Sequence, residues 1–410
     1  MYLYKKPNYY LLIIISISFV TNYRFFENSD SISFLFVELI LLSVLFVFIS
    51  KIFLLKKQEF LLSSPHIPSN HLVIFSIMAS LMLFNLFFLQ NIDFTHRLSI
   101  IKELVEGMIL YTLIFLIDIK KEDVRKILLS FIGFAFFASI FAIIQINTGE
   151  FRFFEAESSK WKTGYSLMDL NSVLDLPTAL GLFNHPNNFG YYLAVAFILA
   201  VFLIKNKPLR IIVISIILFT LFNTFARNAL LSSLIVITVT YFLFNRLRKN
   251  EKVIILVVLL LSFITLLSLV FTQNLTGLTL NMSWRFIQWQ ETLAMISSHP
   301  SVLLFGGGTF FMETESFFRY PYPHNLLLYA IIDYGVLNTT LLLLVLITTL
   351  KNLLKNNSSE SKALFASLFV IFLFGLTDDY LVQHQHILLS FFFLGLANKI
   401  ILLRNMNDEE

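Results

Sequence analysis

The chain has 410 residues, of which 57% are hydrophobic and only 14% are charged, and its mean hydropathy is +0.78. A soluble domain usually contains about 45–50% apolar and about 25% charged residues. The composition therefore excludes a soluble enzyme of two or three domains and predicts a polytopic membrane protein. The chain has no Cys, which excludes disulfides, thiolate catalysis and Cys-ligated metals. A net charge of +4 says more about membrane topology than about nucleic acid, and we expect no nucleic-acid partner.

Long apolar segments follow one another along the whole chain. A helix needs about 20 mainly apolar residues to cross the bilayer, and twelve segments meet this requirement. We therefore expect an all-α fold with a single transmembrane domain over residues 1–410. The expected spans are 9–26, 32–55, 71–90, 100–119, 127–147, 187–204, 209–225, 228–245, 253–272, 325–350, 363–380 and 384–403. The first is the weakest, because Thr21, Asn22 and Arg24 interrupt it.

Lys and Arg are distributed unevenly between alternate connections. If the N-terminus is cytoplasmic, 21 of the 30 basic residues lie inside and 9 outside. Cytoplasmic loops of membrane proteins carry such an excess of Lys and Arg. Twelve spans with both termini in the cytoplasm are therefore expected.

Two outer segments, residues 148–186 and 273–324, are too long to be simple connections. Both contain Trp, which favours burial, so we expect them to be structured. In the second, an amphipathic helix is expected from Trp284 to Ile296, lying on the outer surface. Its apolar face carries Phe286, Trp289, Leu293 and Ile296, and another face carries Arg285, Gln288 and Thr292.

Three arginines gather on the outer side. Arg227 lies in a tight turn between the seventh and eighth spans, Arg285 begins the amphipathic helix, and Arg319 precedes His324 and Asn325. The planar guanidinium forms two parallel hydrogen bonds and stays charged, so it suits a diphosphate. Three arginines around one outer cavity would suit a lipid-linked pyrophosphate. Alternatively, a single outer Arg simply binds lipid headgroups.

His324 follows the rigid segment Tyr320–Pro323 at the start of a span. A neutral imidazole there can take a proton from an attacking hydroxyl, or it can simply cap the helix.

Other polar groups near the outer side suit binding. His185 and Asn187 lie in an amide-rich turn that could bind sugar hydroxyls. Asp378 and Asp379 end the eleventh span and could hold a sugar, orient an arginine, or only terminate the helix. No set of His and carboxylates has metal-ligand spacing with a third partner, so we expect no metal and no other cofactor.

Four segments occur in a characteristic order. They are Gly181–Gly190; Arg227 with Leu231; Arg285–Trp289 with His299, Pro300 and Gly306–Gly308; and His324–Asn325 followed after nine residues by Gly335. In this order they resemble the O-antigen ligase and polymerase superfamily of bacterial envelope glycosyltransferases. The resemblance covers roughly residues 180–340.

The resemblance implies metal-independent, inverting glycosyl transfer at the outer face of the bacterial cytoplasmic membrane. The donor would be a glycan on undecaprenyl pyrophosphate, and the acceptor a glycan or a lipid. A chain-length regulator and a flippase of the same pathway would be partners. By the family pattern Arg227 and Arg285 would hold the diphosphate, and His324 would orient or deprotonate the acceptor hydroxyl. The residues expected to bind substrate are Arg319, Asn325, His185, Asn187, Asp378 and Asp379.

Three functions remain open. Asn338 stands where the family's ligases often have Gly, Thr or Tyr, and together with the long first outer loop it favours a polymerase over a ligase. A transporter of lipid-linked glycan would suit twelve spans, and Glu38, Glu103 and Glu106 could form a proton pathway. However, the sequence has no internal repeat, and its polar residues gather at the outer mouth, which favours an enzyme.

Overall fold

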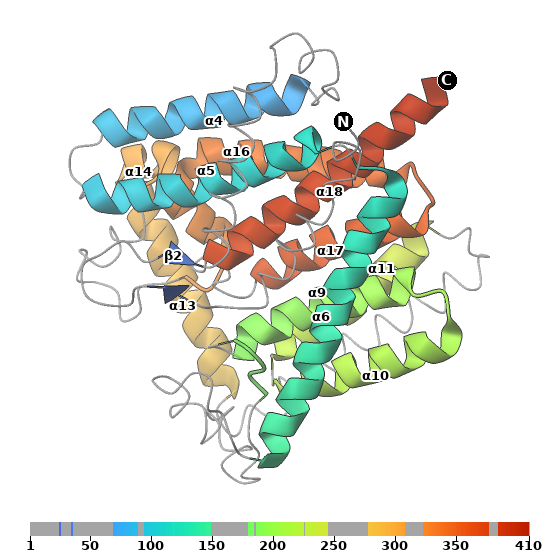
Figure 1. Cartoon of the computed structure of the whole chain (residues 1–410). Coiled ribbons are helices and arrows are strands. Elements are labelled where there is room, and N and C mark those ends of the chain that lie inside the picture. The colour runs from blue at the N-terminus through green and yellow to red at the C-terminus, as the bar shows by residue number, and fades with distance from the viewer. Residues whose placement is uncertain are drawn as a thin grey trace.

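The computed structural model is helical, with one short strand pair. It describes residues 24–25, 34–35, 69–88, 94–117, 119–148, 179–183, 186–224, 226–244, 278–307, 323–376 and 384–409. The helices are α4 (Ser69–Phe88), α5 (Phe94–Leu116), α6 (Lys121–Thr148), α9 (Pro186–Leu203), α10 (Lys207–Asn223), α11 (Arg227–Phe244), α13 (Leu278–Ser298), α14 (Pro300–Phe305), α16 (Leu326–Leu354), α17 (Ser359–Gly375) and α18 (His384–Glu409). Figure 1 shows their arrangement.

Nine of the twelve expected spans coincide with a helix to within several residues at each end, namely α4, α5, α6, α9, α10, α11, α16, α17 and α18. The expected spans 9–26, 32–55 and 253–272 lie outside the described residues, apart from four positions. At those positions the helical prediction is wrong, because β1 (Arg24–Phe25) pairs antiparallel with β2 (Phe34–Leu35). Three of the four residues are Phe or Leu, and Phe favours strands.

Among the residues that the structure describes, five helices are long and apolar enough to cross a membrane. They are Lys121–Thr148, Pro186–Leu203, Arg227–Phe244, Leu326–Leu354 and His386–Met406. The predicted multi-pass membrane protein is therefore confirmed at this level. The number of twelve spans and the side on which the termini lie stay predictions.

The helices α5 and α18 lie side by side along much of their length (Figure 1). Gly107 of α5 leaves room for the ring of Phe391, and Gly395 of α18 leaves room for Ile114. Such small residues let membrane helices approach closely. Lys399 of α18 also lies between the two helices, and its side chain is only 2% exposed. Its Nζ donates to the carbonyls of Phe115 and Ile117, each at 3.0 Å.

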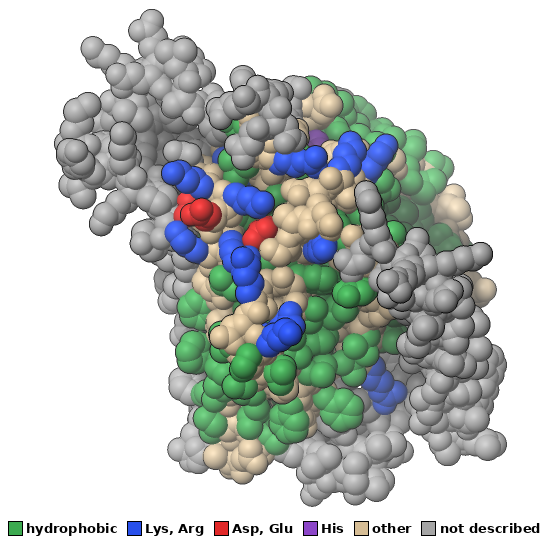
Figure 2. All heavy atoms as spheres, turned by 90° about the vertical axis from the view of Figure 1, so that its right-hand side faces the viewer, with side chains coloured by type: hydrophobic (Ala, Val, Ile, Leu, Met, Phe, Trp, Pro, Cys, Tyr) green, Lys and Arg blue, Asp and Glu red, His purple; other side chains and the backbone are tan. Residues whose placement is uncertain are grey.

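Several helix ends meet at one end of the bundle, which we call the basic end. Arg125 at the start of α6 donates to Glu360 Oε1 of α17 at 2.9 Å and to the Leu203 carbonyl of α9 at 2.6 Å. Arg404 of α18 donates to the Lys355 carbonyl at the end of α16. Figure 2 views this side of the molecule, over which Lys and Arg side chains gather. Its exposed lysines are Lys120, Lys121, Lys126, Lys205, Lys207, Lys351 and Lys355.

All of these lysines belong to the set that the sequence assigns to the cytoplasm. Their clustering at one end therefore agrees with the distribution expected from the positive-inside rule. The structure contains no membrane, so the side that this end faces stays a prediction.

Candidate functional site

The four sequence segments come together at the end of the bundle opposite the basic end. The starts of α9, α11, α16 and α18 and the ends of α10 and α17 meet there. In Figure 1 this region lies to the left, beside α13 and α14. The segments form two pairs, and each pair is joined by a close main-chain approach.

The first pair consists of the Gly181–Gly190 segment and the turn that contains Arg227. A Cβ added at Gly190 would lie 2.4 Å from the Ala226 Cβ and 3.0 Å from Thr224 Oγ1. Only glycine therefore lets the start of α9 lie this close to the arginine turn. The Ala179 N–H also donates to the Asn223 carbonyl at 2.9 Å. These contacts fix the arginine turn against α9.

Arg227 is the first residue of α11 and its side chain is exposed. Within the described part of the chain it forms no hydrogen bond or ion pair. The dipole of a helix favours an anion near its N-terminus, and the guanidinium adds a full positive charge there. The role of Arg227 in binding a phosphate group stays a prediction.

Asn188 of α9 is held inside the bundle by a histidine that the sequence analysis did not assign to the site. Asn188 Oδ1 lies 3.1 Å from His386 Nε2 of α18, and both side chains are buried. The ring of Tyr191 packs against His386 and against Phe374 of α17. Asn188 therefore joins α9 to α18. Its neighbour Asn187 is half-buried in the first turn of α9.

The second pair joins α13 to the start of α16. Trp289 Nε1 of α13 donates to the Pro323 carbonyl at 2.7 Å, directly before His324. His324 itself has φ +46°, a left-handed conformation that costs a residue with a Cβ about 1–2 kcal/mol. The helix cap that the sequence left open for His324 is formed by Asn325. Its Oδ1 accepts from the Leu327 and Leu328 N–H groups, and its Nδ2 donates to the Leu376 carbonyl.

The glycine turn after α14 packs on a break in α16. The break is at Gly335, with φ +77° and ψ 164° inside an otherwise helical segment. Gly306 has φ +84°, and the Gly307 N–H donates to the Ile332 carbonyl at 2.7 Å. The chain therefore bends at Gly306 and Gly307. This bend joins α14 to α16.

The residues of the expected amphipathic helix lie within α13, but the buried face of α13 is not the predicted apolar stripe. Gln288 and Thr292 are 4% and 0% exposed, whereas Leu293 is 53% exposed. The buried face continues through Met295 and Ile296 onto Ile332 of α16. Positions 285, 288 and 292 follow one another at helical spacing, so the Arg285 position lies on the face that turns toward α16.

The structure thus places four of the predicted site residues at one end of the bundle: Arg227, Asn187, His324 and Asn325. The backbone of Arg285 lies on α13, one turn before Trp289. The two pairs are linked through α17, because Phe374 contacts Tyr191 and the Leu376 carbonyl accepts from Asn325. The side chain of Arg285 and the residues His185, Arg319, Asp378 and Asp379 lie outside the described residues, so their roles stay predictions.

Over the described ranges, no group of three or more His, Asp or Glu side chains is close enough to hold an ion. His185, Asp378 and Asp379 lie outside these ranges, so the expected absence of a metal stays a prediction.

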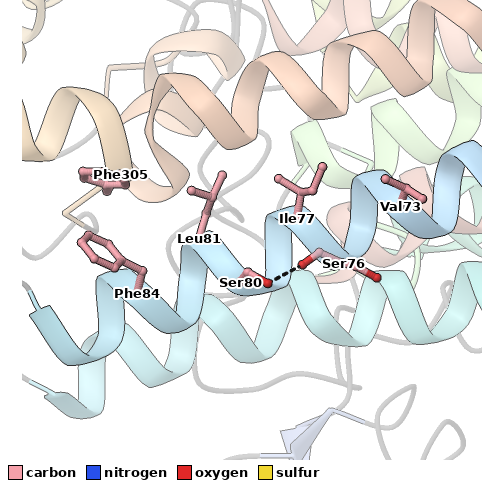
Figure 3. A pocket seen from close by; sticks show the side chains of 7 residues that line it. All are labelled: Val73, Ser76, Ile77, Ser80, Leu81, Phe84 and Phe305. Atoms are coloured by element: carbon pink, nitrogen blue, oxygen red, sulfur yellow. Dashed lines mark hydrogen bonds between the residues drawn. The ribbon is translucent and has the colours of Figure 1, made fainter.

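An open groove of about 670 Å³ runs along α4 and ends at Phe305, next to Gly306. Figure 3 shows its seven lining residues, all of them uncharged. Its two serines are Ser76 and Ser80, and the Ser80 hydroxyl donates to the Ser76 carbonyl. The groove therefore suits an apolar chain and has no cation for a diphosphate.

Comparison with known proteins identifies one family. Residues 211–343 match the family model described as O-antigen ligase. The matched segment contains the arginine turn, α13, the glycine turn and the start of α16, and it ends shortly after Gly335. The match confirms the resemblance to this family over three of the four segments, and the segment Gly181–Gly190 lies before the matched residues. No curated protein matches the chain with significant similarity.

Proposed function

We propose that this chain, which carries an O-antigen ligase family domain at residues 211–343, polymerises lipid-linked oligosaccharide repeat units by glycosyl transfer. The observation that carries the proposal is the hydrogen bond from Trp289 to the Pro323 carbonyl. It ties the helix that bears Arg285 to the peptide that precedes His324. Arg227 stands at the same end of the bundle, so a cation and a proton acceptor are available to one substrate.

The reaction is a single displacement at the anomeric carbon of the donor. A hydroxyl of the acceptor glycan attacks that carbon, and the bond to the diphosphate oxygen breaks. His324 takes the hydroxyl proton, while Arg227 and Arg285 stabilise the negative charge on the departing diphosphate. The configuration at the anomeric carbon inverts, because only one displacement occurs.

Apolar surfaces beside these residues support a lipid-linked donor. A cavity of about 130 Å³ begins at Leu326 and Leu327, directly after His324 and Asn325, and lies among α5, α16, α17 and α18. The groove along α4 ends at Phe305, next to Gly306 of the glycine turn. The undecaprenyl chain would lie against surfaces of this kind while the diphosphate stays near Arg227.

The site faces outward in this proposal. The basic end, at the opposite end of the same helices, carries the lysines that the positive-inside rule assigns to the cytoplasm. The enzyme would therefore act at the outer face of the inner membrane of a bacterium, after a flippase has delivered the donor.

A ligase that moves the finished glycan to a lipid acceptor is the second candidate, since it uses the same donor chemistry. The preference for a polymerase rests on Asn338 and the long first outer loop. Asn338 is buried, and its Nδ2 donates to the Tyr334 carbonyl. The helix break at Gly335 is also a feature of transporters. Here, however, it packs on the Gly306 turn and belongs to the helix that begins beside His324.

The test is to incubate the purified protein in lipid vesicles with undecaprenyl-pyrophosphate repeat units alone and to separate the products by size. A polymerase produces a ladder of rising length, because one molecule serves as donor and another as acceptor. Product that forms only after a separate lipid acceptor is added would identify a ligase. Absence of transfer in both cases, with movement of the donor across the vesicle membrane, would identify a transporter.

A further inference from the structure

We propose that Trp289 is a positioning residue for His324, and that its indole N–H sets the orientation of the imidazole for proton transfer. The inference rests on the proposed role of His324 as the proton acceptor. Trp289 itself touches no reacting atom in this account, because it acts through the peptide that precedes His324.

The contact geometry shows how Trp289 acts. The Pro323 carbonyl that accepts from Trp289 Nε1 at 2.7 Å belongs to the same planar peptide unit as the His324 N–H. When this carbonyl is held in place, the whole peptide unit before His324 is held in place. The peptide unit is one of the two groups that define φ of His324. That φ is +46°, the only positive value at a residue other than glycine among the residues described.

His324 is held from its other side as well. Asn325 donates to the Leu376 carbonyl at 3.0 Å and caps α16 through two backbone N–H groups. The peptide unit before His324 is thus anchored to α13, and the side chain of the next residue, Asn325, is anchored to the end of α17. A strained conformation of this kind persists only where the surroundings determine it, and such residues concentrate at functional sites.

The same indole also couples His324 to the Arg285 position. Trp289 lies four residues after Arg285, so both occupy adjacent turns of α13. Gln288 and Thr292 are buried, so this side of α13 packs against the bundle. Trp289 therefore sets the separation between the helix that carries the diphosphate-binding arginine and the histidine that receives the proton.

Loss of the indole N–H would leave the Pro323 peptide free to rotate and His324 free to relax to negative φ. The donor would still bind through the arginines, but the imidazole would be misplaced. A displacement of about 1 Å at a reacting group can cost roughly 100-fold in rate. We therefore expect a lower kcat, an unchanged KM for the donor and a protein that remains folded.

The experiment uses full-length protein in lipid nanodiscs and two variants. Trp289→Phe removes the N–H donor, and replacement of Trp289 by 3-benzothienylalanine removes it while keeping the shape of the indole. Gln290→Ala, at an exposed neighbouring position of α13, is the control. The measurements are kcat and KM for undecaprenyl pyrophosphate release, the thermal midpoint, and the rates at which diethyl pyrocarbonate modifies His324 and His299, resolved by mass spectrometry.

The proposal predicts that both Trp289 variants lower kcat by about 10- to 100-fold and change the modification rate of His324. KM, the thermal midpoint and the modification rate of His299 at the start of α14 should keep their wild-type values. An unchanged His324 rate in both variants would overturn the proposal. A lower thermal midpoint with equal changes at His324 and His299 would also overturn it, because Trp289 would then only stabilise α13. If the wild type releases no undecaprenyl pyrophosphate, the proposed function fails, but the two modification rates still decide whether Trp289 orients His324.

Discussion

Gly335 lies directly against Gly306, so that main chain meets main chain at this joint between α14 and α16. A Cβ at Gly335 would lie 2.3 Å from the Leu304 carbonyl oxygen, and a Cβ at Gly306 would lie 2.3 Å from the Asp333 carbonyl oxygen. Both glycines also have positive φ. The spacing from His324 to Gly335, which the resemblance emphasises, therefore has a physical reason: it carries the chain from the candidate proton acceptor to this joint.

Substitution of Gly335 should disrupt the joint. Gly335→Ala combines a carbonyl clash with a left-handed backbone, which alone costs about 1–2 kcal/mol, so we expect a clear fall in the thermal midpoint and in transfer activity. Gly133→Ala on α6 is the matched control, because a Cβ there meets no atom within 4 Å. That change should be neutral or slightly stabilising, since Ala favours helices over Gly by about 1 kcal/mol. Equal midpoints for both variants would show that the joint carries no strain.

Arg227 should tolerate no replacement that loses the forked guanidinium. Arg227→Lys keeps the charge but not the two parallel hydrogen bonds, so donor affinity should fall by roughly 10-fold, and Arg227→Ala should lower it by about 100-fold or more. The measurement is binding of an undecaprenyl-pyrophosphate glycan to protein in nanodiscs. Arg210→Ala at the basic end is the control and should bind as the wild type does. If Arg227→Lys bound the donor with wild-type affinity, Arg227 would act through its charge alone and not through its two parallel hydrogen bonds.

Lys399 should stabilise the α5–α18 pair by satisfying the last carbonyls of α5. Lys399→Met keeps the length of the side chain but leaves the Phe115 and Ile117 carbonyls without this donor. Each unsatisfied buried carbonyl costs about 1–3 kcal/mol, so the thermal midpoint should fall by several degrees. Lys351→Met, at an exposed position of α16, should leave it unchanged. A stable Lys399→Met protein would mean that other groups or lipid satisfy these carbonyls.

The contact between Glu360 and Arg125 should make the stability of the folded protein depend on pH. Burial alone would raise the pKa of Glu360, but hydrogen bonds from its backbone N–H, from Arg125 and from Ser359 hold the pKa below its ordinary value. Glu360 lies ahead of the expected span 363–380. Because the folded pKa is lowered, the stabilisation is present at neutral pH and is lost as the pH falls through that pKa.

Glu360→Gln should therefore lower the thermal midpoint at pH 7, and its difference from the wild type should shrink under acid conditions. The exposed Glu122 of α6 provides the control, and Glu122→Gln should behave as the wild type at every pH. A difference between Glu360→Gln and wild type that stays constant down to acid pH would contradict the assignment.

Hydropathy predicted the helices well, because each described span is a long apolar segment bounded by polar residues. It could not predict which helices meet. Trp289 looks like one more apolar position of an amphipathic helix, and only the fold brings its N–H to Pro323. Asn188 and His386 are nearly 200 positions apart, and nothing in their local sequence indicates that they pair.

The face of α13 shows why a helical pattern alone is insufficient. Gln288 and Thr292 read as the exposed side of a surface helix, yet they are buried, and Leu293 is exposed. In water an apolar side chain drives burial, but a helix beside lipid can expose leucine at little cost and turn polar groups inward. The sequence pattern predicted a helix here, but it could not show which of its side chains the bundle covers.

The most direct test of the account is the rate of undecaprenyl pyrophosphate release from lipid-linked repeat units by the protein in vesicles. The wild type should be compared with Arg227→Ala, Arg285→Ala, His324→Ala and the control Arg210→Ala. We expect that all four variants insert and fold, that Arg210→Ala keeps the wild-type rate, and that the rates of the other three fall by about 100-fold or more. Wild-type rates in the His324 and Arg285 variants would contradict the account, because the residues joined through Trp289 would then have no part in the chemistry.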